Sequence, residues 1–220
     1  MFRVWKWVSM FAAVLFISGC NFGGNPTENI YDHLEKAVTL EDVFEQQQEP
    51  LVQLEAKEQK VYEQIKGLSM NEFSQIQKLS DEAISIVEKR KEHLQKEKES
   101  IDASKEEFKQ IEPIIEKVEE KNVQQKGQEL YKAMDERYAA YDKLYSSYDK
   151  ALKLDKELYE MFKNKELTLE ETRKQIEKIN ESYQAVMKAN EQFNKQTEQY
   201  NKLKKEFYKA ADLNVTFNEK

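Results

Sequence analysis

The sequence predicts an all-α protein, an elongated antiparallel helical bundle or coiled coil of three to four long helices. From Glu28 to Ala211 the chain is dominated by Leu, Glu, Lys, Gln and Ala, which are strong helix formers. Apolar residues recur there at alternating spacings of three and four, which places them on one face of a helix. The same stretch shows no alternating strand pattern. The high charged fraction of 35% and the mean hydropathy of −0.88 would suit a disordered chain, but the periodicity argues against disorder.

The first predicted helix carries an apolar seam from Ile30 to Leu68. The seam consists of Ile30, Ala37, Leu40, Phe44, Leu51, Leu54, Val61, Ile65 and Leu68. The motif Thr39-x-x-Asp42 imitates a helix cap, but the seam passes through it in register, so we expect the helix to continue. Pro50 is expected to kink the helix and Gly67 to end it.

The second predicted helix opens at the capping box Ser69-x-x-Glu72. Its seam consists of Phe73, Ile76, Ser80, Ala83, Val87, Arg90, Leu94, Glu97, Ile101, Ser104, Phe108, Ile111, Ile115 and Val118. Four of these positions are polar, which predicts a thin or partly wet core. Pro113 is expected to kink the helix. The apolar stripe slips by about two residues after Val118, which predicts a break between Asn122 and Gly127.

The third predicted helix is unusually rich in tyrosine. Its stripe contains Tyr131, Tyr138, Tyr141, Tyr145, Tyr148 and Tyr159, together with Met134, Leu152 and Phe162. Helical spacing favours a core stripe, because aromatic rings bury well while their hydroxyls reach a polar partner. The alternative is a docking face made by Tyr138, Tyr141, Tyr145 and Tyr148, because tyrosine is enriched in interfaces and its ring stacks on sugars.

The fourth predicted helix opens at the capping box Thr168-x-x-Glu171. Its seam consists of Leu169, Thr172, Ile176, Ile179, Tyr183, Val186, Asn190, Phe193, Thr197, Tyr200, Lys204, Phe207 and Ala211. Short connections make neighbouring helices antiparallel. We therefore expect one helical domain at 28–211, on the order of 60 Å long, followed by a tail at 212–220.

The first twenty residues have the layout of an export signal. Arg3 and Lys6 are followed by the apolar stretch Trp7–Ile17 and by small residues before Cys20. The apolar stretch would span roughly 16 Å as a helix, too short for a hydrocarbon core of about 30 Å. The motif Ile17-Ser18-Gly19-Cys20 resembles a bacterial lipobox, which implies cleavage after a signal peptide at 1–19 and lipidation of Cys20 by diacylglycerol, with acyl chains such as palmitate. An ordinary cleaved signal would instead leave the chain's one cysteine as an unpaired thiol.

After such cleavage, residues 20–27 form a short tether with two glycines and one proline. The loss of Arg3 and Lys6 would leave 33 basic and 42 acidic side chains, a net charge near −9. That charge argues against a nucleic-acid partner. His33 and His93 lie far apart, and no metal-binding, phosphate-binding or nucleophile motif occurs. We expect no catalytic residues, no metal and no cofactor, and so not an enzyme.

The chain resembles the YkyA-type cell-wall-binding lipoproteins of Gram-positive bacteria. The resemblance rests on Ser18-Gly19-Cys20, on the segment YAAYDKLYSSYDKAL within 131–158 and on the ending YNKLKKEFYKAADL. It covers nearly the whole chain. It implies an all-helical body in a Gram-positive envelope, anchored on the outer face of the cell membrane and facing the wall, with no ligand residues to carry over.

Three functional hypotheses follow. The first is a non-catalytic module that binds the cell wall. The second is a scaffold that docks another envelope protein, and the third is an accessory subunit of an envelope enzyme such as a wall hydrolase. A net charge near −9 would repel polyanionic wall polymers over a Debye length of about 8 Å. Direct wall binding would then need a local basic patch, tyrosine stacking or the position given by the lipid. The sequence leaves the oligomeric state open.

Replacing Cys20 with serine tests the anchor. Because Cys20 is the one candidate acceptor, Cys20→Ser should release the protein from the membrane or leave the signal uncleaved. Detergent phase partitioning and the size of the chain measure both outcomes. A shortened Cys20→Ser protein that still partitions into detergent would contradict lipidation at this residue.

Overall fold

The structure is a computed structural model, and it describes residues 25–213 and residue 215. The expected signal peptide at 1–19, the lipobox and Cys20 lie outside the described residues. Within them the helical body begins at Pro26, so the end of the expected tether is already helical.

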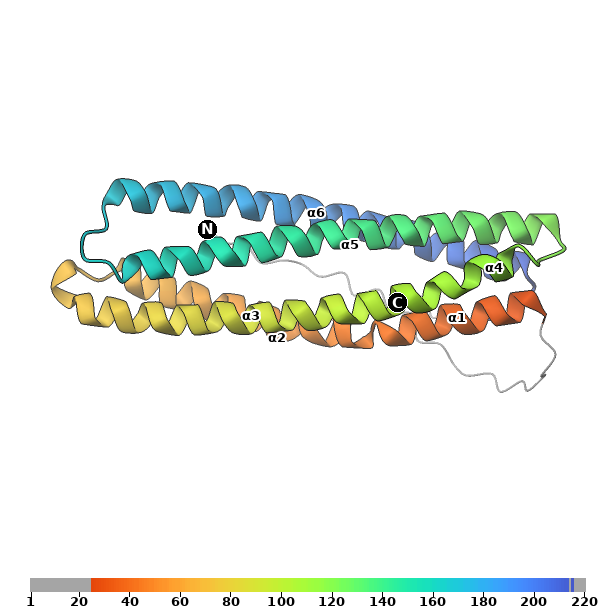
Figure 1. Cartoon of the computed structure of the whole chain (residues 1–220), viewed down its shortest axis with the longest axis horizontal. Helices are drawn as coiled ribbons and strands as arrows, with labels where there is room; N and C mark the ends of the chain where they lie inside the picture. Colours follow the sequence, from red (N-terminus) through yellow and green to blue (C-terminus); the bar gives the residue numbers. More distant parts are fainter. Residues whose placement is uncertain (1–24, 214, 216–220) are drawn as a thin grey trace.

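Four helical arms make up the described chain (Figure 1). The first arm is α1 and α2, the second is α3 with its short extensions, and the third and fourth are α5 and α6. Their bounds are α1 Pro26–Leu40, α2 Asp42–Lys66, η1 Met70–Glu72, α3 Phe73–Phe108, η2 Lys109–Ile111, α4 Glu112–Ile115, α5 Lys121–Phe162 and α6 Leu169–Ala210.

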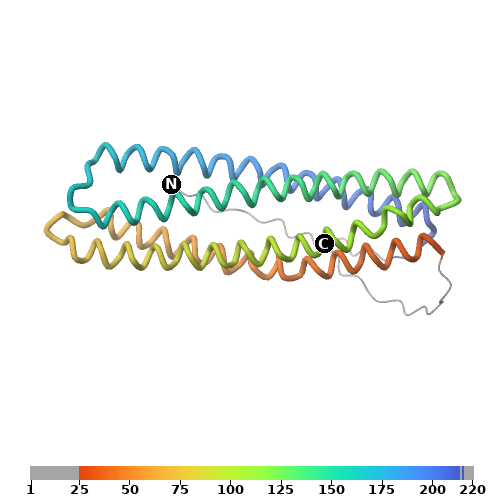
Figure 2. The backbone as a smooth tube through the Cα atoms, viewed as in Figure 1, coloured from red at the N-terminus to blue at the C-terminus, as the bar shows by residue number. Residues whose placement is uncertain are grey.

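The arms lie side by side along one long axis (Figure 2). The first arm packs on α3, α3 packs on α5, and α5 packs on α6. Helix α6 has 42 residues, which corresponds to about 63 Å. The turn between α2 and α3 and the turn between α5 and α6 lie at the same end, which we call the far end, whereas α1 begins at the opposite end (Figure 1). The predicted all-α bundle is confirmed.

Both predicted capping boxes form and fix two of the helix starts. The Ser69 amide donates to Glu72 Oε2 at 3.1 Å. The Thr168 amide donates to Glu171 Oε2 at 2.9 Å, and the Glu171 amide returns a bond to Thr168 Oγ1 at 3.2 Å. These reciprocal bonds satisfy amides that would otherwise be orphaned at a helix start. Gly67 follows the end of α2, as predicted.

Two predicted features of the helices are wrong. The first arm is interrupted at Glu41, where α1 ends and α2 begins. The side chain of Ser100 on α3 causes the interruption locally: its hydroxyl donates to the Leu40 carbonyl at 2.6 Å and accepts from the Phe44 amide at 3.1 Å. A side chain inserted in this way is an ordinary cause of a helix kink.

The second error concerns the reversal between the second and third arms. The chain turns at 116–120, and residues 122–127 already belong to α5. Gly127 is buried inside α5, where a Cβ atom would lie 3.2 Å from Ile115 Cγ1. The glycine therefore permits close approach of α4 to α5 and does not end a helix. Pro50 lies inside α2, and Pro113 lies in the first turn of α4 just after a 3₁₀ segment.

The seams supply most of the core, but Leu169, the first position of the fourth seam, is 87% exposed. All positions of the second seam after Phe73 are buried, including the four polar ones, Ser80, Arg90, Glu97 and Ser104. Each of these four polar side chains forms at least one hydrogen bond or ion pair with another group of the protein. Ser80 Oγ donates to the Ile76 carbonyl at 2.8 Å, and Glu97 accepts from the Gln48 amide. Arg90 and Ser104 belong to larger clusters.

Truncating one ring of the tyrosine stripe tests its contribution to the core. Tyr141 is 0% exposed and packs edge-on against Phe44 and Phe193. Tyr141→Ala should lower the free energy of unfolding by about 3 to 5 kcal/mol. The matched Tyr145→Ala removes a half-buried ring and should cost much less. Thermal melts followed by circular dichroism measure both, and equal losses would contradict this description of the core.

Candidate functional site

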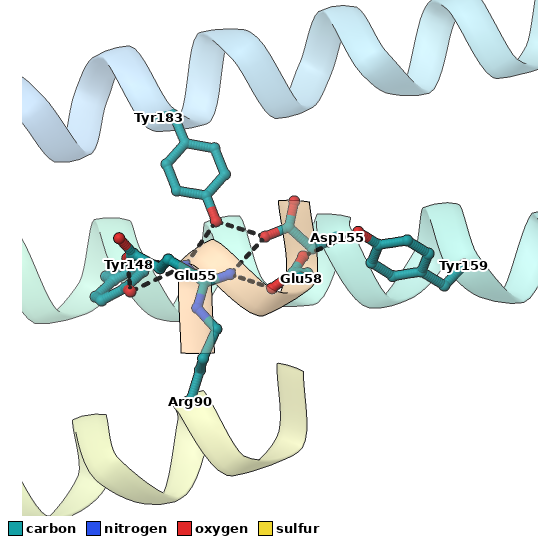
Figure 3. Close-up of polar contacts among 7 residues, drawn as sticks. All are labelled: Glu55, Glu58, Arg90, Tyr148, Asp155, Tyr159 and Tyr183. Atoms are coloured by element: carbon teal, nitrogen blue, oxygen red, sulfur yellow. Dashed lines mark hydrogen bonds and ion pairs between the residues drawn. The ribbon is translucent and has the colours of Figure 1, made fainter. Parts of the chain in front are cut away.

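The largest polar cluster of the described chain surrounds Arg90 in the middle of α3. Arg90 is only 2% exposed. Its guanidinium points between the other arms, and residues from α2, α5 and α6 converge on it (Figure 3). We call this group the Arg90 centre; it consists of Arg90, Glu55, Glu58, Tyr148, Asp155, Tyr159 and Tyr183.

The two terminal nitrogens of Arg90 hold the Arg90 centre together. Nη1 lies 2.5 Å from Glu58 Oε2 and 3.4 Å from Asp155 Oδ2. Nη2 lies 3.1 Å from Glu55 Oε1. It also donates to the hydroxyls of Tyr148 and Tyr183, each at 2.9 Å.

The tyrosine hydroxyls in turn donate hydrogen bonds to the carboxylates. The hydroxyl of Tyr183 donates to Asp155 Oδ2 at 2.5 Å, and the hydroxyl of Tyr159 donates to Glu58 Oε1 at 3.1 Å. The hydroxyl of Tyr148 donates to Glu55. One arginine and three tyrosines therefore satisfy three carboxyl groups, and the contacts join all four arms.

Burial perturbs the ionisation of this centre. Desolvation, reinforced by the nearby charge of Glu58 and opposed by Arg90, raises the pKa of Asp155 to about 7. Desolvation alone would lower the pKa of Arg90, but Tyr148, Tyr183 and the carboxylates hold it well above its usual value. The guanidinium stays charged, while Asp155 takes up a proton near neutral pH.

A second cluster, the Arg137 centre, lies towards the end of the bundle where α1 begins. Arg137 on α5 forms a two-pronged ion pair with Glu41, at 2.7 Å from Nη1 to Oε1 and 2.6 Å from Nη2 to Oε2. Its Nε donates to Thr197 Oγ1 on α6 at 3.0 Å. Ser104 on α3 donates to Glu41 Oε1 at 2.9 Å and lies 2.8 Å from the Tyr138 hydroxyl. This centre also joins all four arms.

The four tyrosines considered as a docking face do not form an exposed surface. Tyr138, Tyr141 and Tyr148 are buried, and two of them belong to the arginine centres. Tyr145 is half-buried, and its hydroxyl donates to Gln95 Oε1 at 2.9 Å. Their rings fill the interior because they lie on the face of α5 that packs on α3 and α6. A ligand outside the folded bundle could reach no more than the edge of Tyr145.

The two histidines are not brought together. His33 Nδ1 lies 2.7 Å from Glu107 Oε1, and His93 Nδ1 lies 2.8 Å from Gln47 Oε1. Over residues 25–213, no group of three or more His, Cys, Asp or Glu side chains is placed to hold a metal ion. In the same part of the chain, no helix has the length and apolar character needed to cross a bilayer.

Sequence reasoning noticed Arg90, Glu97 and Ser104 as polar gaps but missed their partners. A signal was available: Glu58 falls at seam spacing between Leu54 and Val61, and Asp155 falls between Leu152 and Tyr159. A charge at a seam position must be buried and therefore paired. The pattern could not say which buried acid meets which arginine, because their separations run to 65 and 96 residues.

One other surface feature stands out. Met70 is 58% exposed and Leu169 is 87% exposed, and each lies beside one of the two turns at the far end of the bundle. The side chains of Leu68, Phe73, Met161, Phe162 and Leu167 near these turns are half-buried. Lys165 Nζ lies 5.0 Å from the centre of the Phe73 ring and so connects the two turns. We call these residues the far-end patch.

The fold and the two centres define an elongated four-arm α-helical bundle whose interior is joined by buried ion pairs. The chain belongs to the YkyA family: residues 25–210 match the family described as "Putative cell-wall binding lipoprotein", as the resemblance in the sequence predicted. "Uncharacterized lipoprotein YkyA" of Bacillus subtilis (strain 168) is 38% identical over 160 residues, which cover 73% of this chain and 71% of that protein.

A solved structure shares the fold. The 1.6 Å crystal structure of a conserved protein of unknown function from Staphylococcus aureus matches with a TM-score of 0.74. The match covers 82% of this chain and 91% of that one, at 16% sequence identity. At that identity the likeness concerns the fold alone.

Removing Arg90 tests the ionic centre. Arg90→Met should lower the free energy of unfolding by about 3 to 5 kcal/mol at pH 8, because buried carboxylates lose their cation. A carboxyl group whose folded pKa is raised stabilises the fold when protonated, and this contribution fades as pH rises through the folded pKa. Asp155 has a pKa of about 7 even with Arg90 present, so it is protonated at pH 5. The cost of Arg90→Met should therefore be smaller at pH 5 than at pH 8.

A matched substitution separates the loss of the buried ion pairs from the general effect of removing a cation. Lys156 forms an exposed ion pair with Glu88 at 2.9 Å. Lys156→Met should therefore cost much less than Arg90→Met at pH 8, and its cost should not depend on pH in this range. Urea titrations at pH 5 and pH 8 measure all four values. If Arg90→Met cost the same at both pH values, the buried carboxyl groups would not be the cause.

Proposed function

We propose that this protein is a lipid-anchored, non-catalytic binding module of the cell envelope, attached through Cys20 to the outer face of the cell membrane and facing the wall. The lipobox supports the anchor, and the family description supports the binding role. The observation that carries the proposal is the short distance in sequence between Cys20 and the first helical residue, Pro26.

This spacing determines where the bundle can lie. Six residues of extended chain reach about 20 Å at most. The end of the bundle that contains Pro26 therefore stays close to the lipid headgroups. The far end can stand up to about 60 Å further out, because the arms are parallel to one long axis and α6 alone has 42 residues. Such a shape suits a module that reaches from a membrane towards the wall.

The interior supports a binding role over a catalytic one. The carboxyl groups of Glu58 and Asp155 both pair with the guanidinium of Arg90 inside the bundle. Each is less than a tenth exposed. A substrate could reach them only if the four arms separated. Their contacts explain how these three residues stabilise the fold and set the register of the helices, so no catalytic role is needed to account for them.

A second candidate function is docking of another envelope protein. The far-end patch favours it, because Met70 and Leu169 expose apolar side chains at the end of the bundle that lies opposite Pro26. Exposed apolar groups gathered in one place are a common mark of a protein interface. A docking role would use the bundle as a spacer and its far end as the contact.

Two measurements distinguish the candidates. For direct wall binding, the purified full chain in detergent should co-sediment with purified, protein-free cell walls, and Met70→Asp with Leu169→Asp should retain most of that binding. For protein docking, sedimentation should fail, and cross-linking in intact cells should give a discrete adduct that the same double variant loses. Neither sedimentation nor an adduct would contradict both functions.

The chain offers a matched control for the double variant. Val43 and Met187 are the other large apolar side chains that the described chain exposes, at 43% and 58%. They lie along the arms, away from the far end. Val43→Asp with Met187→Asp makes the same chemical change and should leave either interaction intact. Equal loss in both double variants would indicate a general effect of added negative charge.

A further inference from the structure

The outer surface of the α5–α6 pair is hollowed by a groove of about 360 Å³. This size is at the lower end of the range for small-molecule sites. Its polar lining comes from both helices: Ser146, Ser147 and Lys150 of α5, and Lys178, Glu181 and Ser182 of α6. The lining is rich in hydroxyl groups, because three of its eight residues are serines.

One of these hydroxyl groups is buried without a partner. Ser182 is 5% exposed, and its Oγ has no hydrogen-bond partner within the described residues. A helical serine often donates to the carbonyl four residues earlier, as Ser80 does to Ile76. Leaving a buried hydroxyl unpaired is energetically unfavourable. A ligand atom in the groove would supply the missing bond.

The groove also contains two cations with no ion pair. Lys150 and Lys178 form none with any residue of the described chain, whereas Lys153 and Lys156, which also lie on α5, pair with Asp149 and Glu88. Glu181 is the one acidic residue of the lining, so the lining carries a net charge of +1. A locally positive groove in a chain of formal net charge −7 favours a small anion.

The chemistry of the lining narrows the ligand. Two ammonium groups and several hydroxyl donors suit the oxygens of a phosphate group. Glu181 can accept from ligand hydroxyls, and Leu154 and Ala185 offer apolar surface to a carbon skeleton. We propose that this groove binds the phosphate ester of a polyol or sugar. This assignment rests on the proposed envelope function in one respect, namely the place where the protein would meet such an ester.

The Arg90 centre holds the groove in shape. Ser147 is next to Tyr148 and Ser182 is next to Tyr183, and both tyrosines bond to Arg90 at 2.9 Å on the inner side of the same two helices. The spacing of α5 and α6 at the groove is therefore fixed before a ligand arrives. A preformed site avoids the entropic cost of ordering its walls on binding.

Equilibrium dialysis of the full chain in detergent tests the site with defined probes. The probes are sn-glycerol 3-phosphate, glucose 6-phosphate, inorganic phosphate, glycerol and an oligomer of glycerol phosphodiester. The two esters should bind saturably and more tightly than inorganic phosphate, and glycerol should not bind. The oligomer should bind no more tightly than one ester unit, because the negative body repels its remaining phosphates.

Two sets of variants locate the binding. Lys150→Gln with Lys178→Gln should weaken ester binding at least tenfold, and Ser182→Leu should abolish it by filling the groove. Lys143→Gln with Lys188→Gln makes the same change in net charge on the same two helices outside the groove and should leave binding unchanged. Circular dichroism melts establish that each variant is folded.

Several outcomes would overturn the proposal. These are no saturable ester binding, binding no stronger than that of inorganic phosphate, equal loss in the two lysine pairs, or tighter binding of the oligomer than of the single ester. Wall sedimentation separates this inference from the envelope function proposed above. If the Lys150 and Lys178 variant still sediments with walls, and the unsubstituted chain binds no ester, the groove assignment fails and the envelope function stands.

Discussion

The cost of leaving a buried charge unpaired governs how the four arms fit together. Arg90 and Arg137 lie in the core, where an isolated charge is strongly unfavourable. Each finds its carboxylate on another arm, Glu58 and Asp155 for Arg90 and Glu41 for Arg137. A heptad seam alone tolerates a slide of seven residues, about 10 Å along the axis. The two centres remove that freedom, as single polar residues do in coiled coils.

The tyrosines also help to satisfy the buried charges. Most of their rings fill the core, and several of their hydroxyls donate to carboxylates that an apolar interior would leave unsatisfied. Tyr159, Tyr183 and Tyr208 bond to Glu58, Asp155 and Glu35 in this way. Phenylalanine would supply the same rings without the donors. The abundance of tyrosine, which in the sequence also fits a docking face, therefore has an explanation inside the bundle.

Local patterns were enough to predict most of the fold. The seams predicted the helices, and Gly67, Ser69 and Thr168 predicted two of the three reversals, because capping depends on residues close in sequence. The interruption at Glu41 could not be predicted, since its cause, Ser100, belongs to another arm. The break predicted between Asn122 and Gly127 was wrong for a similar reason, since Gly127 packs against Ile115 across the turn. The Arg90 centre and the α5–α6 groove likewise depend on which arms become neighbours.

The interruption at Glu41 has a mechanical consequence. Any tension between the start of α1 and the far end travels along the first arm, through the one place where its helix is broken. Hydrogen bonds inside a helix lie along the axis, so a pull opens them one after another. At this point the Leu40 carbonyl bonds to Ser100 on α3 and the Glu41 side chain bonds to Arg137 on α5, so these bonds leave the first arm sideways. A pull must shear these bonds together, and the load passes from one arm to the whole bundle.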